Sequence, residues 1–254
     1  MRQGVTWRAY LPSQYRSVTG RAVQPFDVTT QSTLRRLYAG VFAEMLPSKI
    51  GQQLGHPTQS LLGWMVKRFL LWHNEVLEKN AVRLCGIQPD DTVLEVGFGP
   101  GLGLEFAASL LSGTRGKLFG VDYSEFMCKL ASKRVQGHIA SGKVTLYQAR
   151  VEAMPLPDST VDKVFHCNCY YFWPDLRAGT AEIHRVMKPG GQMVATLKVH
   201  SLAKLASKKI LTGENWHPEA YIDALQATGF TDIRMEDKKD KHITYQAIFA
   251  TASK

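Results

Sequence analysis

The chain has 254 residues, of which 44% are hydrophobic and 21% are charged, and four are cysteines. This composition excludes an intrinsically disordered protein, a fibrous repeat and a small disulfide-framed domain, and it suits one α/β domain with additions. The formal charge of +9 suggests an anionic partner, a membrane surface or a targeting segment, but it carries no information about the fold.

Much of this charge lies at the N-terminus. Before residue 44 there are six arginines and a single acid, Asp27. Such arginine-rich, acid-poor sequence is typical of a mitochondrial presequence and predicts a mitochondrial location; without a presequence the prediction is cytoplasmic. The alternative is an irregular basic extension, because Pro12, Gly20 and Pro25 interrupt any long amphipathic helix. Apart from a short helical pattern over residues 34–42, the segment 1–57 is interpreted as this extension.

After Pro57, apolar residues such as Val66, Phe69 and Leu77 recur at helical spacing. They predict one helix of about 25 residues that ends near Gly86, so residues 58–86 are interpreted as a lid or packing helix. Its aromatic stripe favours core packing, with peripheral membrane contact as the alternative. No apolar stretch reaches the ~20 residues of a membrane span.

From residue 88 the pattern alternates between strand and helix. The β-α alternation predicts a doubly wound sheet, mostly parallel, with helices on both faces. The last strand follows a short turn, so it should pair antiparallel with its predecessor and give one antiparallel edge strand. In this domain, residues 87–254, strands are predicted at 92–96, 117–121, 144–148, 161–167, 193–199, 231–235 and 243–251, helices at 104–111, 124–135, 176–187 and 217–228, and turns at 188–191 and 238–241.

The first predicted strand runs directly into Gly97, Gly99 and Gly101. Open α/β folds bind ligands at the carboxyl ends of their strands, and glycines let a ligand approach the backbone closely. A dinucleotide fingerprint needs a small residue where this chain has Leu102. Glu95, two residues before the first glycine, would repel a pyrophosphate but suits a cationic ligand. The loop therefore disfavours NAD, although a nicotinamide-dependent oxidoreductase remains an alternative.

Asp122 ends the second predicted strand, 25 residues after Gly97. An acid at this interval accepts ribose hydroxyls in nucleotide-binding α/β domains. A single strand-terminal Asp is common, but together with the glycine loop it indicates a ribose-binding site.

Four motifs in this order resemble those of class I S-adenosylmethionine-dependent methyltransferases, and more narrowly the type 11 group that includes ubiquinone/menaquinone-biosynthesis C-methyltransferases and phospholipid N-methyltransferases. The resemblance covers about residues 60–200 and implies a Rossmann-like fold with S-adenosyl-L-methionine as the cofactor. The motifs are VLEVGFGPG at 93–101, GVDYS at 120–124 with Met127, MPLPDS at 154–159 with Val161 and Asp162, and RVMKPGG at 185–191.

The resemblance also implies cofactor-binding roles. Glu95, Gly97, Gly99 and Gly101, in the loop that also contains Phe98, would hold the methionyl amino and carboxylate end of the cofactor. Asp122 would accept the ribose hydroxyls, Tyr123 and Met127 would flank the adenine, Val151 and Glu152 would lie at its edge, and Asn168 would face the methyl group. One departure stands out. The family commonly has Gly-Asp where this chain has Ala149-Arg150, and an arginine accepts no hydrogen bond. Either the adenine rests on backbone contacts or Arg150 turns outward.

The segment 167–174 should form the rim of the acceptor pocket, with Tyr171 and Trp173 as candidate substrate contacts and Phe172 packed against the helix beneath. These aromatic residues suggest an apolar or planar acceptor, a small molecule or a lipid-like molecule, methylated by in-line transfer. A catalytically silent, cofactor-binding partner protein is the alternative. No general base is assigned, because a histidine within a strand such as His166 is more often a core residue.

Two further classes of ligand are disfavoured. Cys167 and Cys169 lack a second pair at zinc-site spacing, so no metal is predicted, and the four cysteines indicate a reducing compartment. The basic residues between 198 and 209 are interpreted as a solvated helix face. Nucleic acid is not favoured as a partner, because aromatic residues are not interleaved with that basic run. The oligomeric state is not predicted.

Overall fold

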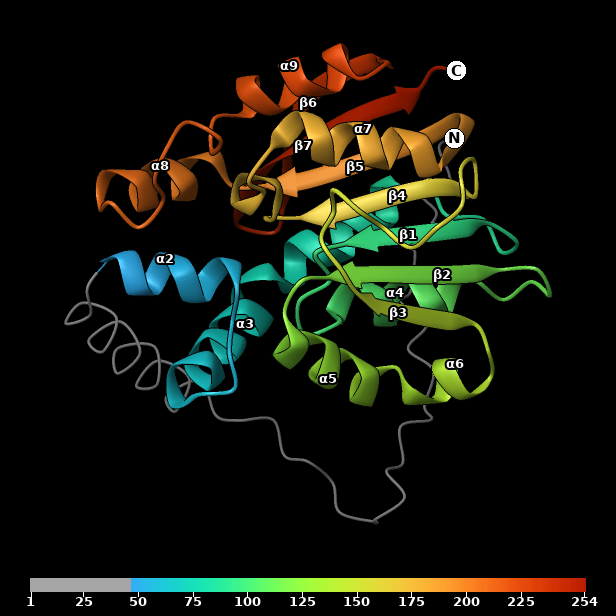
Figure 1. The fold of residues 1–254 in the computed structure, drawn as a ribbon, viewed down its shortest axis with the longest axis horizontal. Helices are drawn as coiled ribbons and strands as arrows, with labels where there is room; N and C mark the ends of the chain where they lie inside the picture. The colour runs from blue at the N-terminus through green and yellow to red at the C-terminus, as the bar shows by residue number, and fades with distance from the viewer. Residues whose placement is uncertain (1–46) are drawn as a thin grey trace, which may run out of the picture. The chain divides into compact units, whose positions relative to one another are not determined.

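A computed structural model describes residues 47–254. The seven strands in this part of the chain form one sheet in the order β3-β2-β1-β4-β5-β7-β6 (Figure 1). They are β1 (Thr92–Val96), β2 (Lys117–Asp122), β3 (Val144–Gln148), β4 (Val161–Cys167), β5 (Met187–Leu197), β6 (Phe230–Asp240) and β7 (Ile243–Ala252). Strands β1 to β5 pair in parallel, whereas β7 is antiparallel to both of its neighbours, β5 and β6. The predicted doubly wound, mostly parallel sheet with a mixed edge is confirmed.

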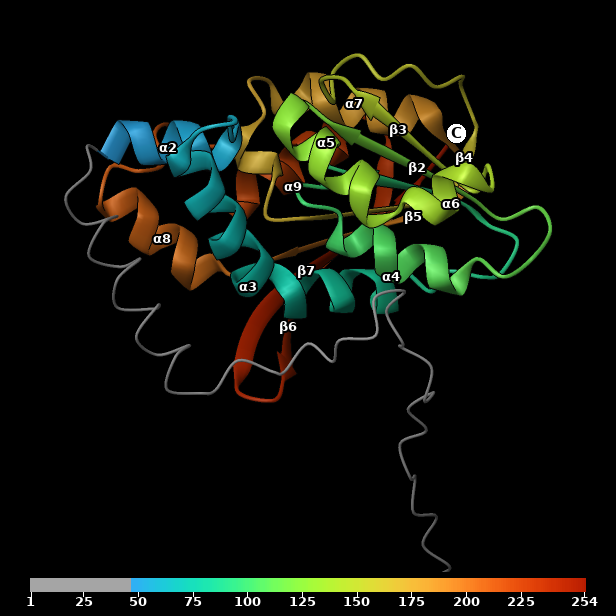
Figure 2. The same ribbon diagram turned by 90° about the horizontal axis from the view of Figure 1, so that it is seen from below.

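Helices cover both faces of the sheet (Figure 2). Apolar side chains of α3, α4 and α5 pack on one face, and those of α7 and α9 on the other. The helices are α2 (Pro47–Gly55), α3 (Leu61–Leu84), α4 (Leu102–Leu110), α5 (Glu125–Arg134), α6 (Gln136–Ala140), α7 (Leu176–Val186), α8 (Val199–Ser207) and α9 (Pro218–Ala227), with a 3₁₀ turn over Tyr170–Phe172. None of the helices between residues 47 and 254 is long and apolar enough to cross a membrane.

The central strands explain the continuous apolar runs in the sequence. Val93 and Leu94 of β1, and Val164 and Phe165 of β4, are completely buried because helices cover both faces. Each such side chain contributes about 1.5–3 kcal/mol relative to an exposed one. This rigid centre fixes the loops that follow β1, β2 and β4, which lie together at the carboxyl edge of the sheet.

The turn predicted at 188–191 is wrong, and the one predicted at 238–241 is confined to Lys241 and His242. Residues 188–191 belong to β5, where they form a bulge: Val161 pairs with Met187, but Lys163 pairs with Gln192. Lys238 and Asp240 continue β6, because they pair in register with β7 along the exposed edge, where charged side chains are tolerated. Of the predicted extension over residues 1–57, residues 47–55 form the helix α2. The rest up to residue 46, with the predicted presequence and the helical pattern over 34–42, lies outside the described residues.

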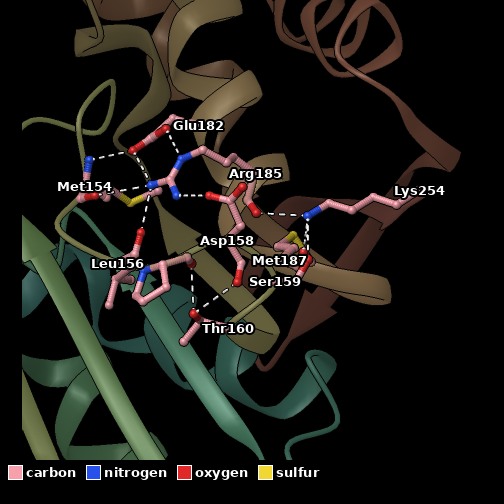
Figure 3. Close-up of polar contacts among 10 residues, drawn as sticks. Met154, Leu156, Asp158, Ser159, Thr160, Glu182, Arg185, Met187 and Lys254 are labelled. Atoms are coloured by element: carbon pink, nitrogen blue, oxygen red, sulfur yellow. Dashed lines mark hydrogen bonds and ion pairs between the residues drawn. The ribbon is translucent and has the colours of Figure 1, made fainter.

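Arg185 joins two of the four sequence motifs (Figure 3). Its guanidinium donates to the carbonyl oxygens of Leu156 (2.9 Å) and Met154 (3.3 Å) and to the carboxylates of Glu182 and Asp158. The backbone N–H of Met154 in turn donates to Glu182 at 2.7 Å. The segment after residue 152 is thereby fixed against α7, which holds the preceding loop in place at the sheet edge.

Candidate active site

A cavity of about 380 Å³ lies at the carboxyl ends of β1, β2 and β4. Its volume is within the range of small-molecule binding sites. The strand-end loops form one wall, and α2 with α3 forms the other. Lining residues include Leu54, His56, Pro57, Leu70, Asn74, Glu78, Gly97, Gly99, Asp122, Tyr123, Met127, Arg150, Val151, Glu152, Cys167, Asn168, Cys169, Phe172 and Trp173. Eight of the eleven predicted cofactor-binding residues are in this list.

The other three predicted residues, Glu95, Phe98 and Gly101, belong to the glycine loop or the strand before it but do not line the cavity. Gly97 and Gly99 line the cavity with φ angles of +68° and +51°, and a Cβ on Gly97 would lie 2.8 Å from that of Cys169. Gly101 adopts φ +83° and begins α4, whereas the ring of Phe98 is buried in the core. Only glycine combines this left-handed backbone with so close an approach at position 97. Glu95 lies in β1, directly before the loop, and is almost completely buried.

Asp122 is fixed by backbone donors. Its two carboxylate oxygens accept from the N–H groups of Gly99 and Ser124, both at 2.8 Å. Burial raises the pKa of this carboxyl to about 6, even though these hydrogen bonds act in the opposite direction. Each oxygen keeps a lone pair for a further donor. The predicted link between the glycine loop and Asp122 is therefore a direct hydrogen bond.

The Tyr123 end of the cavity contains a stack of rings. The Tyr123 and His56 rings have centroids 4.4 Å apart, and the Arg150 guanidinium lies 4.4 Å above the Tyr123 ring. Arg150 also donates to the Tyr123 hydroxyl at 3.2 Å and is exposed. It therefore occupies the rim. Glu152 lies at the same end with a buried Oε1 atom that has no hydrogen-bond partner among the described residues.

Sequence reasoning missed the face of α3 that lines the cavity and its two polar residues, Asn74 and Glu78. Leu70, Asn74 and Glu78 recur at four-residue spacing and line the cavity. Asn168, which adopts φ +49°, donates from its side-chain amide to Asn74 at 3.1 Å, so the helix contacts the loop after β4. The available signal was an amide and a carboxyl on the otherwise apolar face of a long helix.

The carboxyl of Glu78 meets that of Glu95. Only 5% of Glu78 and 1% of Glu95 is exposed. Among the described residues, Glu78 Oε2 and both carboxylate oxygens of Glu95 have no hydrogen-bond donor. Burial raises the pKa of Glu78 to about 8, and burial together with the adjacent Glu78 carboxyl raises that of Glu95 well above its usual value.

The predicted acceptor contacts are only partly in the cavity wall. Trp173 and Phe172 line the cavity, but Tyr171 does not, because its ring packs on Tyr170 and Phe172 with centroid distances of 5.3 and 4.7 Å. Phe172 packs against α2 rather than the helix beneath. His166 is fully buried outside the cavity and hydrogen-bonded to a tyrosine hydroxyl at 2.7 Å. Its complete burial agrees with the predicted core position, and the same burial lowers its pKa to about 3.

Comparison with known proteins decides the family. Residues 93–191 match the family model described as "Methyltransferase domain". The uncharacterised methyltransferase YdaC of Bacillus subtilis is 34% identical over 181 residues, which cover 71% of this chain and 93% of that protein. The chain belongs to the class I S-adenosylmethionine-dependent methyltransferases. This assignment replaces the nicotinamide-dependent oxidoreductase alternative.

More distant relatives share parts of the chain. The ubiquinone/menaquinone biosynthesis C-methyltransferase UbiE of Geobacter sulfurreducens is 35% identical over 117 residues, which cover 46% of this chain and 45% of that protein, so this match spans about half of each. Phosphoethanolamine N-methyltransferase 2 of Haemonchus contortus, solved with S-adenosyl-L-methionine, superposes with a TM-score of 0.62 at 17% identity over 81% of this chain and 60% of that chain. This second match shows a shared fold.

The residues present fit the methyltransferase cofactor. S-Adenosylmethionine carries hydrogen-bond donors at its ammonium, its ribose hydroxyls and its adenine amine. The cavity offers buried acceptors without a donor at Glu78 and Glu152, the Asp122 carboxylate and, below the glycine loop, Glu95. Buried acceptors of this kind are destabilising unless they are satisfied by a ligand.

Proposed function

We propose that the enzyme transfers a methyl group by in-line displacement. The acceptor is apolar or planar and is either a small molecule or a lipid-like molecule. The observation that carries this proposal is the aromatic and aliphatic cavity wall formed by Phe172, Trp173, Leu54 and Leu70 near Asn168. Such a wall favours an acceptor that binds by apolar contact. The quinone-biosynthesis methyltransferases among the relatives support the same class of acceptor.

The cofactor roles in this proposal follow the cavity from one end to the other. Tyr123 and Met127 flank the adenine, and Asp122 accepts the ribose hydroxyls. Val151 lies at the adenine edge beside Glu152, whose unpartnered Oε1 atom accepts from the adenine amine. Glu152 thus supplies the acceptor that the family commonly provides at the position of Arg150.

The protein contributes positioning and exclusion of water. The cofactor supplies a methyl group activated by a sulfonium, so an already nucleophilic acceptor needs mainly alignment. Asn168 is held at its backbone N–H by the Thr196 carbonyl at 3.0 Å and at its side chain by Asn74. The helices α2 and α3 form the wall of the cavity opposite the strand ends. This arrangement keeps the Asn168 end of the cavity rigid.

Labelled methyl transfer tests the proposal. The purified protein is incubated with methyl-labelled S-adenosylmethionine and separate lipid, small-molecule and macromolecular extracts, with Asp122→Ala as the inactive control. Label in a small or lipid-soluble product supports the proposal. Label confined to protein or nucleic acid contradicts it. Cofactor binding without any transfer would instead support the catalytically silent partner protein.

We also propose that the arginine-rich stretch before residue 44 directs the protein to mitochondria. The proposal rests on the composition of that stretch, with six arginines and one acid. Residues 1–46 fused to a fluorescent reporter should localise to mitochondria, and replacing the arginines with glutamines should abolish this. A cytoplasmic distribution of the unaltered fusion contradicts the proposal.

A further inference from the structure

Two consecutive elements of the fold, α3 and β1, bring their carboxyl groups together at the cavity. Glu78 comes from the middle of α3 and lines the cavity, whereas Glu95 comes from β1, directly below the glycine loop. Both side chains are more than nine-tenths buried, and three of their four carboxylate oxygens have no donor among the described residues. Within a folded protein, unpartnered buried acceptors are rare and call for an explanation.

The surroundings offer the pair little compensation. The titratable groups that face it are acids: Asp122 at the end of β2, the thiol of Cys167 at the end of β4, and that of Cys169 just after it. Lys198, at the start of α8, interacts electrostatically with Cys167. Burial raises the pKa of both carboxyls, and the adjacent Glu78 raises that of Glu95 further. The contacts of Glu78 with Cys167 and Glu95, and of Glu95 with the Leu104 backbone, act in the opposite direction but are outweighed. The pair therefore holds protons at neutral pH that isolated carboxyls would lose.

A purely structural role explains this arrangement poorly. Replacing buried ionisable groups by neutral residues of similar volume often leaves stability unchanged or raises it. The missing component is a cation that also donates hydrogen bonds. The family's cofactor has two cationic groups, a sulfonium without any N–H and an α-ammonium with three N–H donors. Only the ammonium matches acceptors that lack donors.

We propose that Glu78 acts with Glu95 to bind the α-ammonium of S-adenosylmethionine, and that binding releases a proton from the pair. The O–H bond of the protonated carboxyl breaks, its proton passes to solvent, and the resulting carboxylate accepts an N–H of the ammonium, which keeps its own protons. The proposal rests on the family's cofactor and on the role at its methionyl amino end that the resemblance implies for Glu95. Its new elements are Glu78 as a second ligand, from α3, and the release of a proton. It is independent of the acceptor.

Titration calorimetry tests this assignment with two ligands, S-adenosylhomocysteine and its analogue lacking the α-amino group. The unaltered protein should bind S-adenosylhomocysteine at least about tenfold more tightly than the analogue. Glu78→Gln should remove most of this preference and leave the affinity for the analogue nearly unchanged. The matched control is Glu75→Gln on the same helix, because Glu75 is half exposed and pairs with Lys79. It should retain the full preference.

The outcomes separate a binding role from a structural one. Equal weakening of both ligands by Glu78→Gln would show that Glu78 only shapes the cavity, and an unchanged preference would show that it does not contact the ammonium. Either result overturns the proposal. The proposal is also overturned if the unaltered protein binds both ligands equally tightly. That result does not depend on whether a variant folds. Failure to methylate a small acceptor would leave these results unaffected.

Discussion

The enzyme contains two clusters of charged side chains with opposite designs. In the Arg185 cluster, the guanidinium, the carboxylates of Glu182 and Asp158 and two backbone carbonyls all have partners (Figure 3). The hydrogen bond from Arg185 holds the pKa of Glu182 below its usual value. In the Glu78–Glu95 pair, burial raises the pKa of both carboxyls, and three of four oxygens have no donor among the described residues.

This difference distinguishes charged residues that stabilise the fold from those that bind a ligand. Where each charge is satisfied within the fold, as around Arg185, the result is a fixed segment between β3 and β4. Where acceptors are buried without donors, folding alone leaves an unfavourable free energy that a ligand removes. The two clusters therefore predict opposite responses to substitution: lost stability at Arg185, and lost affinity with gained stability at Glu78.

The largest effect on cofactor affinity is expected at Asp122, whose carboxylate accepts hydrogen bonds within the fold and is also available to the cofactor. Asp122→Ala removes the carboxylate that accepts from Gly99 and Ser124 and, in the proposed function, from the ribose. The dissociation constant for S-adenosylhomocysteine should rise by about 100-fold, since hydrogen bonds to charged groups contribute about 1.5–3 kcal/mol each. Calorimetry measures this, with Asp158→Asn as the control. An unchanged dissociation constant for Asp122→Ala contradicts the assignment.

Arg185→Met should lower the free energy of unfolding by about 2 kcal/mol, because two carbonyls and the carboxylates of Glu182 and Asp158 lose the hydrogen bonds from its guanidinium, and Glu182 keeps only the Met154 N–H. The affinity for S-adenosylhomocysteine should change only a few-fold, since Arg185 does not line the cavity. Urea denaturation and calorimetry on the same sample give both values. If Arg185→Met kept its stability but lost binding, the proposed stabilising role of the Arg185 cluster would be contradicted.

The pH dependence of stability should come from the Glu78–Glu95 pair. Its raised pKa values mean that the folded state holds protons that the unfolded state loses, so stability of the free protein should fall as the pH rises from about 5 to 8. Glu78→Gln should flatten this dependence and raise Tm at pH 8 by about 2–4 °C. A lower Tm for this variant across the whole range would show that the pair stabilises the fold.

The smallest effect is expected at the exposed pair of Glu75 and Lys79. Their side chains are 49% and 51% exposed, and solvent screens such pairs. Glu75→Gln should change the free energy of unfolding by less than about 0.5 kcal/mol. A larger change in urea denaturation would mean that α3 is too sensitive to serve as the background for the Glu78 comparison.

The sequence predicts the fold and one half of the cavity well, because the relevant signals are local. The strand, the glycine loop and Asp122 lie within one β-α-β unit, where spacing alone determines proximity. The role of Glu78 depends on how α3 packs over β1 and β4. An apolar stripe along the helix identifies its buried face, but the register against the sheet edge decides which polar residue reaches the cavity.

The errors in the predicted turns and in the predicted role of Tyr171 have a common origin. Glycines and clustered charges predicted turns at 188–191 and 238–241, yet strand pairing keeps 188–191 and 238–240 in the sheet and leaves only Lys241 of the second segment in a turn. The 3₁₀ turn over Tyr170–Phe172 places Phe172 rather than Tyr171 in the cavity wall. In each case, tertiary contacts outweigh local preference.

The central claim is that the unpaired carboxyls are completed by the cofactor's ammonium, and the number of protons released on binding tests it most directly. Calorimetry of S-adenosylhomocysteine binding at pH 7.5, in buffers of different ionisation enthalpy, gives this number. The unaltered protein should release roughly half a proton or more, and Glu78→Gln should release much less. Binding without proton release in the unaltered protein, or with the same release in both, would contradict the account.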